Sequence, residues 1–228
     1  MNAVAARRGE DARCAERFAE SLARAPERRS PFRHWVLDEL LPSDVIGRVA
    51  ELPFGAPDLN GQSGTRELHN EQRRYFDREA IEAFPVCAEV ADAFRSWHVV
   101  ETIERVTGAS LDGTFLRIEF AQDSSGFWLR PHTDLGVKQF TLLCYVAPDA
   151  RPELGTDVYH DAQRWACRIP FRPGVGLAFV PADNTWHGFE PRIIGGVRKS
   201  LIVNFVSRDW RARDQLAFDE PVVTRRVP

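Results

Sequence analysis

The feature that most limits the fold of this chain is a change in residue pattern after Gly108. From there on, short runs of β-branched and aromatic residues are separated by Gly, Pro, Asn or Asp, which is typical of strands joined by turns. The runs expected to form strands cover 114–121, 138–147, 155–160, 164–171, 175–181 and 197–206. Because no helical periodicity lies between them, they predict an antiparallel sandwich or barrel.

The part before Gly108 predicts helices and one functional loop. Apolar residues recur at helical spacing over 13–24, 42–49 and 85–107, and a short strand is expected at 32–37. Residues 55–64 are expected to form a loop, and the polar stretch that follows (66–76) lacks clear periodicity; a long loop of this kind in a compact domain is often functional. We therefore expect a mainly β protein with flanking helices, as one domain over 1–228. Its parts are an N-terminal helical and substrate-loop part (1–112), a β core (113–206) and a C-terminal extension (207–228).

Charge and cysteine content narrow the partners and the compartment. Thirty basic against thirty-three acidic residues give a net charge of −3, too balanced for the strong positive field that nucleic acid or an anionic membrane requires. No stretch approaches the ~18 apolar residues of a membrane span. The four cysteines lie far apart without a C-x-x-C pair, which favours a reducing, cytoplasmic location. We expect a monomer or homodimer with no nucleic-acid or membrane partner.

Two histidines and one acid form a candidate metal site. His132 and Asp134 precede the strand expected at 138–147, and residues two apart on an extended chain point the same way. His187, in the segment 186–191, offers a third ligand from a distant strand. Two histidines and a carboxylate make the facial triad of non-haem Fe(II) enzymes, which leaves coordination positions open. An H-x-D pattern alone is also common on protein surfaces, so by itself it is a weak signal.

The strand expected at 197–206 has two different faces. Its more apolar face carries Lys199, Leu201, Val203 and Phe205, and the other carries Arg198, Ser200, Ile202 and Asn204. The apolar face is expected to lie under helices, which leaves Arg198 and Ser200 pointing into the barrel. An inward arginine is costly unless an anion or a partner carboxylate meets it, and a bidentate carboxylate with a supporting hydroxyl satisfies that demand.

Together these segments resemble the Fe(II)- and 2-oxoglutarate-dependent oxygenases, whose core is a double-stranded β-helix of the jelly-roll, cupin-like type. The matching pieces, in the family's order and spacing, are PHTD (131–134), KQFTLLCYV (138–146), GTDVY (155–159), GVGLAFVP (174–181), WHGFEP (186–191) and GVRKSLIVNF (196–205). The resemblance covers 113–206 and, loosely, the helices before it. It implies that His132, Asp134 and His187 bind iron, and that Arg198, assisted by Ser200, grips the distal carboxylate of 2-oxoglutarate.

The chain departs from this family at one position and keeps to it at another. Relatives often carry a Tyr on the strand before the H-x-D motif that helps hold 2-oxoglutarate, whereas this chain offers Arg117, Glu119 and Phe120. Which residue takes that part stays open. Asp134 is an intact carboxylate, while halogenating members have a small residue there, so halogenation is not expected. For Lys138 three interpretations stay open: it binds the co-substrate, it supports the site electrostatically, or it is a strand-edge lysine.

Several residues outside these motifs are candidate substrate contacts. They flank the metal motif, lie in the long polar loop, or lie on the strand expected at 114–121: Trp128, Arg130, Arg73, Arg74, Tyr75 and Arg117. For each of them a structural interpretation, as a packed ring or a solvated charge, stands beside the functional one.

The resemblance implies a hydroxylase. With Fe(II), 2-oxoglutarate and O2, such an enzyme hydroxylates a C–H bond and releases succinate and CO2; we expect a small polar metabolite as its substrate. Desaturation or ring chemistry would use the same residues. Two alternatives stay open: a hydroxylase of peptidyl or protein side chains, and a non-catalytic cupin-like binding module in which the three residues hold a structural metal or none.

Overall fold

The structure, a computed structural model, describes residues 3–134, 136–146 and 148–222. The last residue of the strand expected at 138–147 and residues 223–228 of the expected C-terminal extension lie outside the described residues. Among the helices that the structure describes, none has both the length and the apolar character needed to cross a bilayer.

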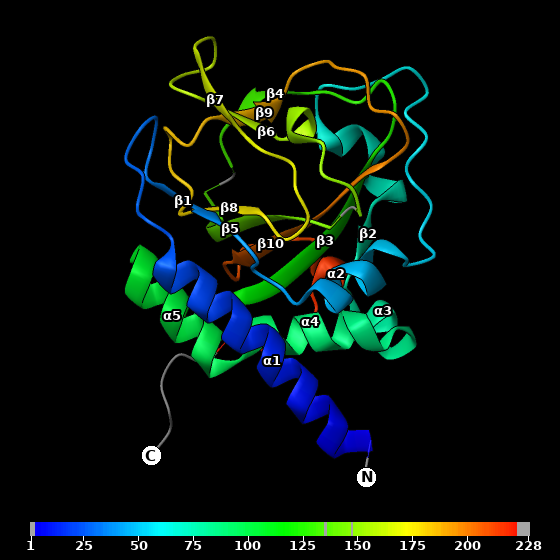
Figure 1. The fold of residues 1–228 in the computed structure, drawn as a ribbon, viewed down its shortest axis with the longest axis vertical. Coiled ribbons are helices and arrows are strands. Elements are labelled where there is room, and N and C mark those ends of the chain that lie inside the picture. Colours follow the sequence, from blue (N-terminus) through cyan, green and yellow to red (C-terminus); the bar gives the residue numbers. More distant parts are fainter. Residues whose placement is uncertain (1–2, 135, 147, 223–228) are drawn as a thin grey trace.

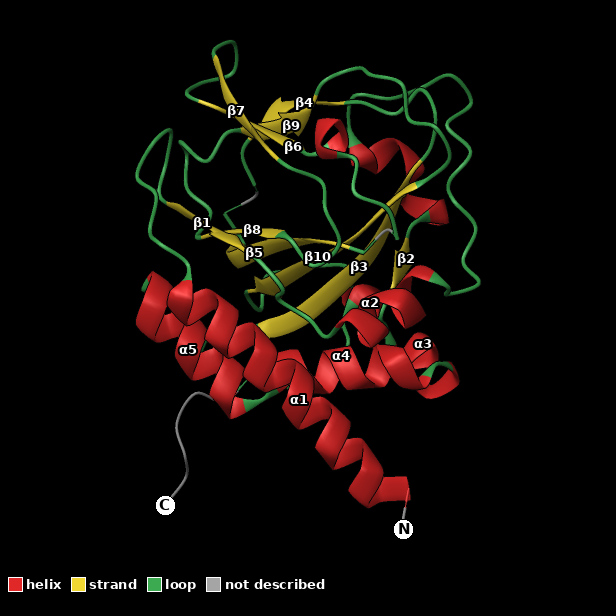
Figure 2. Cartoon of the chain, in the orientation of Figure 1, coloured by secondary structure: helices red, strands yellow, loops and turns green. Residues whose placement is uncertain are grey.

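Two antiparallel sheets face each other and form the core of the molecule (Figure 2). The larger sheet has the order β1-β8-β5-β10-β3-β2, and the smaller one has the order β4-β9-β6-β7. The strands of the larger sheet are β1 (His34–Leu37), β2 (Arg74–Tyr75), β3 (Phe115–Asp123), β5 (Lys138–Tyr145), β8 (Gly176–Phe179) and β10 (Arg198–Val206). Those of the smaller sheet are β4 (Leu129–His132), β6 (Thr156–Tyr159), β7 (Trp165–Ile169) and β9 (His187–Phe189). The expected jelly-roll arrangement is confirmed.

Helices cover the outer face of the larger sheet (Figure 1). They are α1 (Ala3–Arg24), α2 (Ser43–Ala50), α3 (Arg78–Ala83), α4 (Pro85–Arg95) and α5 (Trp97–Thr107). Short 3-10 turns, η1 (Arg66–Gln72), η2 (Pro152–Leu154) and η3 (Arg213–Gln215), lie in the connections. The smaller sheet lies on the side away from these helices, and the space between the sheets is bounded by strands, loops and the 3-10 turn η1 (Figure 2).

The predicted faces of β10 are confirmed by the two hydrophobic cores. Leu201, Val203 and Phe205 belong to the core between the larger sheet and the helices. A second core lies between the sheets, with residues from both, such as Leu143 and Phe189. The polar face of β10 points into that inner space, and this is where the candidate site lies.

The structure differs from the sequence-based expectations in four local features. The helix expected over 85–107 is two helices, because Ser96 adopts an extended backbone (ψ 144°) and its hydroxyl accepts from the Val99 amide of the next helix at 3.4 Å. The first helix begins at Ala3 rather than at 13. The stretch between 55 and 75 holds η1 and β2, which were not expected, and the short strands β4 and β9 were not predicted either.

Candidate active site

The structure brings the three predicted metal ligands together. His132 ends β4 and His187 begins β9, and the two are direct partners in the antiparallel pairing of these strands. Asp134 follows β4. One ligand atom from each residue lies within 4.8 Å of those of the other two. The pairing of β4 with β9 thus brings together His132 and His187, which lie far apart in the sequence.

Hydrogen bonds fix the tautomer of both histidines. The Nδ1 atom of His132 lies 2.9 Å from the carbonyl oxygen of Arg130, and that of His187 lies 2.9 Å from the carbonyl oxygen of Thr185. A carbonyl can only accept, so Nδ1 carries the proton and Nε2 keeps its lone pair. Metal-binding histidines are commonly oriented in this way.

Burial keeps both imidazoles neutral. It lowers the pKa of His132, and it lowers the pKa of His187 to about 4, with the neighbouring His132 contributing. Neutral imidazole is the form that coordinates a metal ion, so neither ring has to lose a proton at neutral pH.

Asp134 is held as a carboxylate by two donors. The Lys138 ammonium donates to Oδ1 at 2.5 Å and the Thr141 hydroxyl donates to Oδ2 at 2.7 Å. Burial alone would raise the pKa of Asp134, but Lys138 and the other neighbours outweigh it and hold that pKa well below its usual range. Lys138 therefore contacts a predicted metal ligand and is not a simple strand-edge lysine.

A cavity of about 290 Å³ contains these three residues in its wall. Its wall is rich in basic side chains: Arg66, Arg73, Arg117, Arg130, Lys138 and Arg198. Of the residues that the sequence singled out as substrate contacts, Arg73, Arg117 and Arg130 line this cavity, whereas Trp128, Arg74 and Tyr75 do not.

The three residues that do not line the cavity have other environments. Trp128 packs its ring on Gly64, where a Cβ atom would come within 2.8 Å of the indole. Arg74 is exposed on β2. Tyr75 is buried, and its ring centroid lies 4.7 Å from the guanidinium carbon of Arg117. Trp128 and Tyr75 thus have packing roles in the structure.

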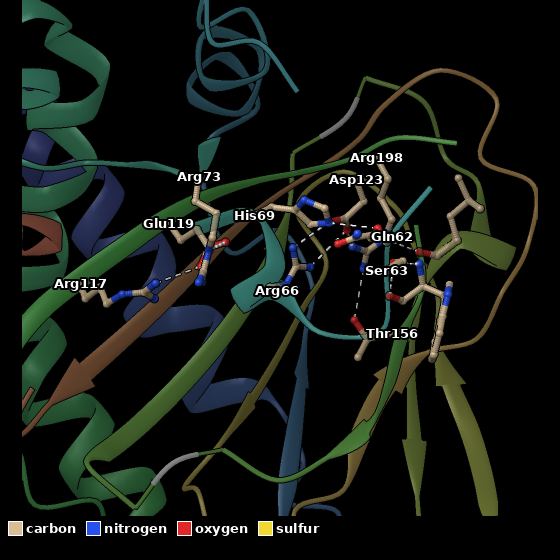
Figure 3. A network of polar contacts seen from close by, with 12 residues as sticks. Gln62, Ser63, Arg66, His69, Arg73, Arg117, Glu119, Asp123, Thr156 and Arg198 are labelled. Carbon is tan, nitrogen blue, oxygen red and sulfur yellow. Dashed lines mark hydrogen bonds and ion pairs between the residues drawn. The ribbon is translucent and has the colours of Figure 1, made fainter. Parts of the chain in front are cut away.

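Arg198 is buried, lines the cavity and donates hydrogen bonds to three protein groups. Its exposed fraction is 2 %. It donates to the Leu154 carbonyl at 2.6 Å, to Asp123 Oδ2 at 2.5 Å and to the Thr156 hydroxyl at 3.3 Å. Arg66, from η1, also binds Asp123, at 2.8 Å and 3.3 Å (Figure 3). A partner carboxylate therefore meets the inward arginine, and two arginines share it.

Ser200 and Tyr145 lie close to this arginine on the inner side of the sheet. The Ser200 hydroxyl is fully buried and has no hydrogen-bond partner among the described residues. The Tyr145 ring centroid is 5.4 Å from the Arg198 guanidinium carbon, and its hydroxyl bonds the Thr156 hydroxyl at 2.9 Å. Tyr145 was missed in the sequence, although the alternation of Thr141, Leu143 and Tyr145 along β5 could have found it.

A second carboxylate that two arginines share, Glu119, lies on β3, the strand that also carries Asp123. Glu119 accepts from Arg73, at 2.9 Å from Nε and by a further short contact from Nη2, and from Arg117 Nη2 at 3.1 Å. Burial raises the pKa of Glu119, but the two arginines outweigh it and hold that pKa well below its usual range. Phe120, the next residue along β3, packs in the core on the helix side.

Comparisons with known proteins give a fold but no sequence family. No protein-family model matches the chain, and no match is found among curated protein sequences. The structure is similar to a prolyl-4-hydroxylase from Pseudomonas putida (TM-score 0.56, 17% identity, 86% of this chain and 94% of that one). It is also similar to HygX from Streptomyces hygroscopicus, solved with nickel and 2-oxoglutarate (0.50, 14%, 78% and 84%).

A third similar structure is a prolyl hydroxylase from Trichoplax adhaerens, solved in complex with a peptide fragment of the hypoxia inducible factor oxygen degradation domain. Its TM-score is 0.57 at 12% identity, over 91% of this chain and 94% of that one. Identities this low establish an architecture rather than an activity. The chain therefore has the fold of the Fe(II)- and 2-oxoglutarate-dependent oxygenases.

Proposed function

We propose that this protein is an Fe(II)- and 2-oxoglutarate-dependent oxygenase that hydroxylates a C–H bond of a small polar metabolite. The observation that carries the proposal is that one cavity holds both a two-histidine, one-carboxylate group and a buried arginine, Arg198. The fold similarity to a prolyl-4-hydroxylase and to HygX, solved with nickel and 2-oxoglutarate, supports it.

The donor set suits ferrous iron. His132 and His187 offer neutral Nε2 atoms and Asp134 offers a carboxylate, which together form a facial triad with open positions. Bound Fe(II), with 2-oxoglutarate and O2, would supply the oxidising chemistry, and succinate and CO2 would be the co-products. Lys138 now neutralises Asp134, so it would release Oδ1 when the metal binds. Because ferrous iron persists under reducing conditions, we place the reaction in the cytoplasm.

The residues around Arg198 suit the distal carboxylate of the co-substrate. Ser200 lies two residues along β10 on the same face, and its unpaired, buried hydroxyl calls for an external partner. Tyr145 and Thr156 add hydroxyls beside the guanidinium. We assign to Tyr145 the part that a Tyr on the preceding strand plays in relatives.

Apolar residues complete the wall between the two groups. Leu143, Phe189 and Ile202 line the cavity, and the Phe189 ring centroid lies 4.8 Å from the Arg198 guanidinium carbon. These side chains exclude water from the co-substrate position. A pair formed between Arg198 and a carboxylate is stronger there than in bulk solvent, because the effective dielectric constant is lower.

The size of the cavity favours a small substrate. About 290 Å³ is at the lower end of the range for small-molecule pockets. A peptidyl substrate is the second candidate, favoured by the similarity to a prolyl hydroxylase solved with a peptide fragment. A binding module without catalysis is disfavoured, since it has no need of both the triad and the buried Arg198.

The test is an anaerobic titration of the apoprotein with Fe(II) and 2-oxoglutarate, monitored by the visible charge-transfer band of a chelated keto acid. We expect the band in the wild type, no band in His132→Ala, and a weakened band in Arg198→Gln. Lys199→Gln is the matched control, because it removes a basic side chain from the opposite face of the same strand. Bound iron without any band would contradict the proposal and favour the binding module.

A further inference from the structure

Strand β3 carries two carboxylates on its inner face, and each is shared by two arginines. The Asp123 cluster consists of Arg66, Asp123 and Arg198, and the Glu119 cluster consists of Arg73, Glu119 and Arg117. Both clusters lie at the same cavity, and Figure 3 shows them side by side. Counted over the described residues, two guanidinium groups in each cluster share one carboxylate, which leaves one positive charge in excess.

The excess charge has an explanation in only one of the two clusters. Burying an uncompensated charge costs free energy, so each cluster calls for an anion. At the Asp123 cluster the proposed co-substrate supplies it through its distal carboxylate. The other carboxylate of 2-oxoglutarate is needed at the metal, so the Glu119 cluster needs an anion from a different molecule.

Arg117 is the arginine of this cluster that lacks a full counter-charge. Its exposed fraction is 2 %. It donates to the neutral amides of Gln215 at 2.8 Å and Asn204 at 3.1 Å, and to one oxygen of Glu119 that Arg73 also binds. Among the described residues, Glu119 is its only anionic hydrogen-bond partner. A guanidinium has five N–H groups, so one hydrogen on each Nη atom is left for a ligand.

The surroundings of Arg117 hold it in place for such a ligand. Its guanidinium carbon lies 4.7 Å from the Tyr75 ring centroid and 4.9 Å from that of Trp210, and Trp210 also lines the cavity. These ring contacts, together with the hydrogen bonds to the side-chain amides of Gln215 and Asn204, fix the orientation of the guanidinium. Glu67 approaches Arg73 from η1, but it is exposed to solvent, which screens its charge.

A chain of hydrogen bonds relates Arg117 to the metal ligands. Arg117 donates to Asn204 at 3.1 Å, Asn204 donates to Thr141 at 2.9 Å, and Thr141 donates to Asp134 at 2.7 Å. The first three are register partners on β3, β10 and β5. Two strand spacings separate β3 from β5, about 10 Å. A small molecule bound to Arg117 by one end can therefore reach the triad with a carbon several bonds away.

We propose that the substrate is a small molecule with an anionic group, a carboxylate, phosphate or sulfate, and that Arg117 binds this group. The proposal rests on the proposed oxygenase function and deepens it by naming the substrate class. Arg117 then determines specificity by charge, Glu119 and Asn204 position it, and the reacting C–H bond lies at a distance from the anionic group.

The test is calorimetric titration of the protein with inorganic phosphate, sulfate and acetate, with and without saturating 2-oxoglutarate. In the wild type we expect one anion site to persist when 2-oxoglutarate is bound, and the ranking of the three anions to show which group it prefers. Arg117→Gln should weaken that site about tenfold or more and leave 2-oxoglutarate binding intact. Arg172→Gln, at an exposed arginine, controls for loss of charge in general.

A second variant guards against misfolding of Arg117→Gln. Glu119→Gln removes the carboxylate that competes for Arg117, so phosphate should bind about tenfold tighter. A single anion site that 2-oxoglutarate fully displaces, unchanged in both variants, would overturn this inference and leave the oxygenase proposal standing. Phosphate binding that depends on Arg117, in a protein that binds no 2-oxoglutarate, would support the anion site and overturn the oxygenase proposal.

Discussion

The two faces of β10 are equally buried but chemically opposite. On the helix side, Leu201, Val203 and Phe205 are fully buried in an apolar core. On the inner side, Arg198 and Asn204 are as completely buried, yet they are polar and hydrogen-bonded. Apolar burial stabilises the fold directly, whereas buried charges are at best offset by their partners. The outer face therefore stabilises the fold, whereas the polar inner face contributes less to stability, which fits the binding role that we propose for it.

The largest expected effect is a loss of metal affinity when a residue of the inner site is removed, with little change in stability. His132→Ala removes one of three ligands, and a ligand is worth about 3–4 kcal/mol of metal affinity, so Fe(II) binding should weaken by about 100- to 1000-fold. The free energy of unfolding of the metal-free protein should change little, because the side chain is only half-buried. Calorimetric metal titration and urea denaturation measure the two quantities. His160→Ala, at an exposed histidine, is the control.

The outer face should show the reverse behaviour. Phe205→Ala leaves a cavity between β10 and the helices, at a side chain with no exposed surface, and should lower the free energy of unfolding by about 3–5 kcal/mol. Metal affinity of the folded fraction should be unchanged. Ile193→Ala, at a side chain that is 90 % exposed, should stay within about 0.5 kcal/mol. A large loss of metal affinity in Phe205→Ala would contradict the view that the outer face contributes to stability alone.

The stability of the protein should depend on pH through His187, which faces the inner space. The pKa of His187 is about 4 in the folded protein, below the value of 6.5 expected for an unfolded chain, so the unfolded state binds more protons between these values. The stability of the metal-free protein should therefore fall as pH decreases from 6.5 to 4, by up to about 3 kcal/mol. Urea denaturation across this range measures it. His187→Gln should flatten the curve, and an equally steep curve in that variant would assign the effect to other groups.

Local sequence patterns predicted those site residues that lie close together on one strand or extended segment, because side chains there point to alternating faces. The contrast between Arg198 and Leu201 on β10 was legible because strand periodicity is short-range. The H-x-D spacing of His132 and Asp134 was legible for the same reason. His187 was proposed as a third ligand from a distant strand, the family resemblance supported that choice, and the structure places it opposite His132 by strand pairing.

Pairings between distant segments could not be predicted in this way. Asp123 was not singled out, because its role depends on Arg66, which reaches it from η1, and on Arg198 from β10. The strands β4 and β9 span only four and three residues, too short for a periodic pattern to emerge. Their pairing depends on tertiary contacts rather than on propensity.

The smallest expected effect tests whether the helix layer communicates with the inner face. Ser96 ends α4 by donating to the Ala93 carbonyl at 2.7 Å and begins α5 by accepting from the Val99 amide at 3.4 Å. Ser96→Ala should therefore lower the free energy of unfolding by about 1 kcal/mol, measured by urea denaturation. The affinity for 2-oxoglutarate should not change, since both helices pack on the outer side of the sheet (Figure 1). A loss of affinity at unchanged stability would mean that the angle between α4 and α5 is transmitted through β3 to the arginine clusters, and the division between the two faces would have to be abandoned.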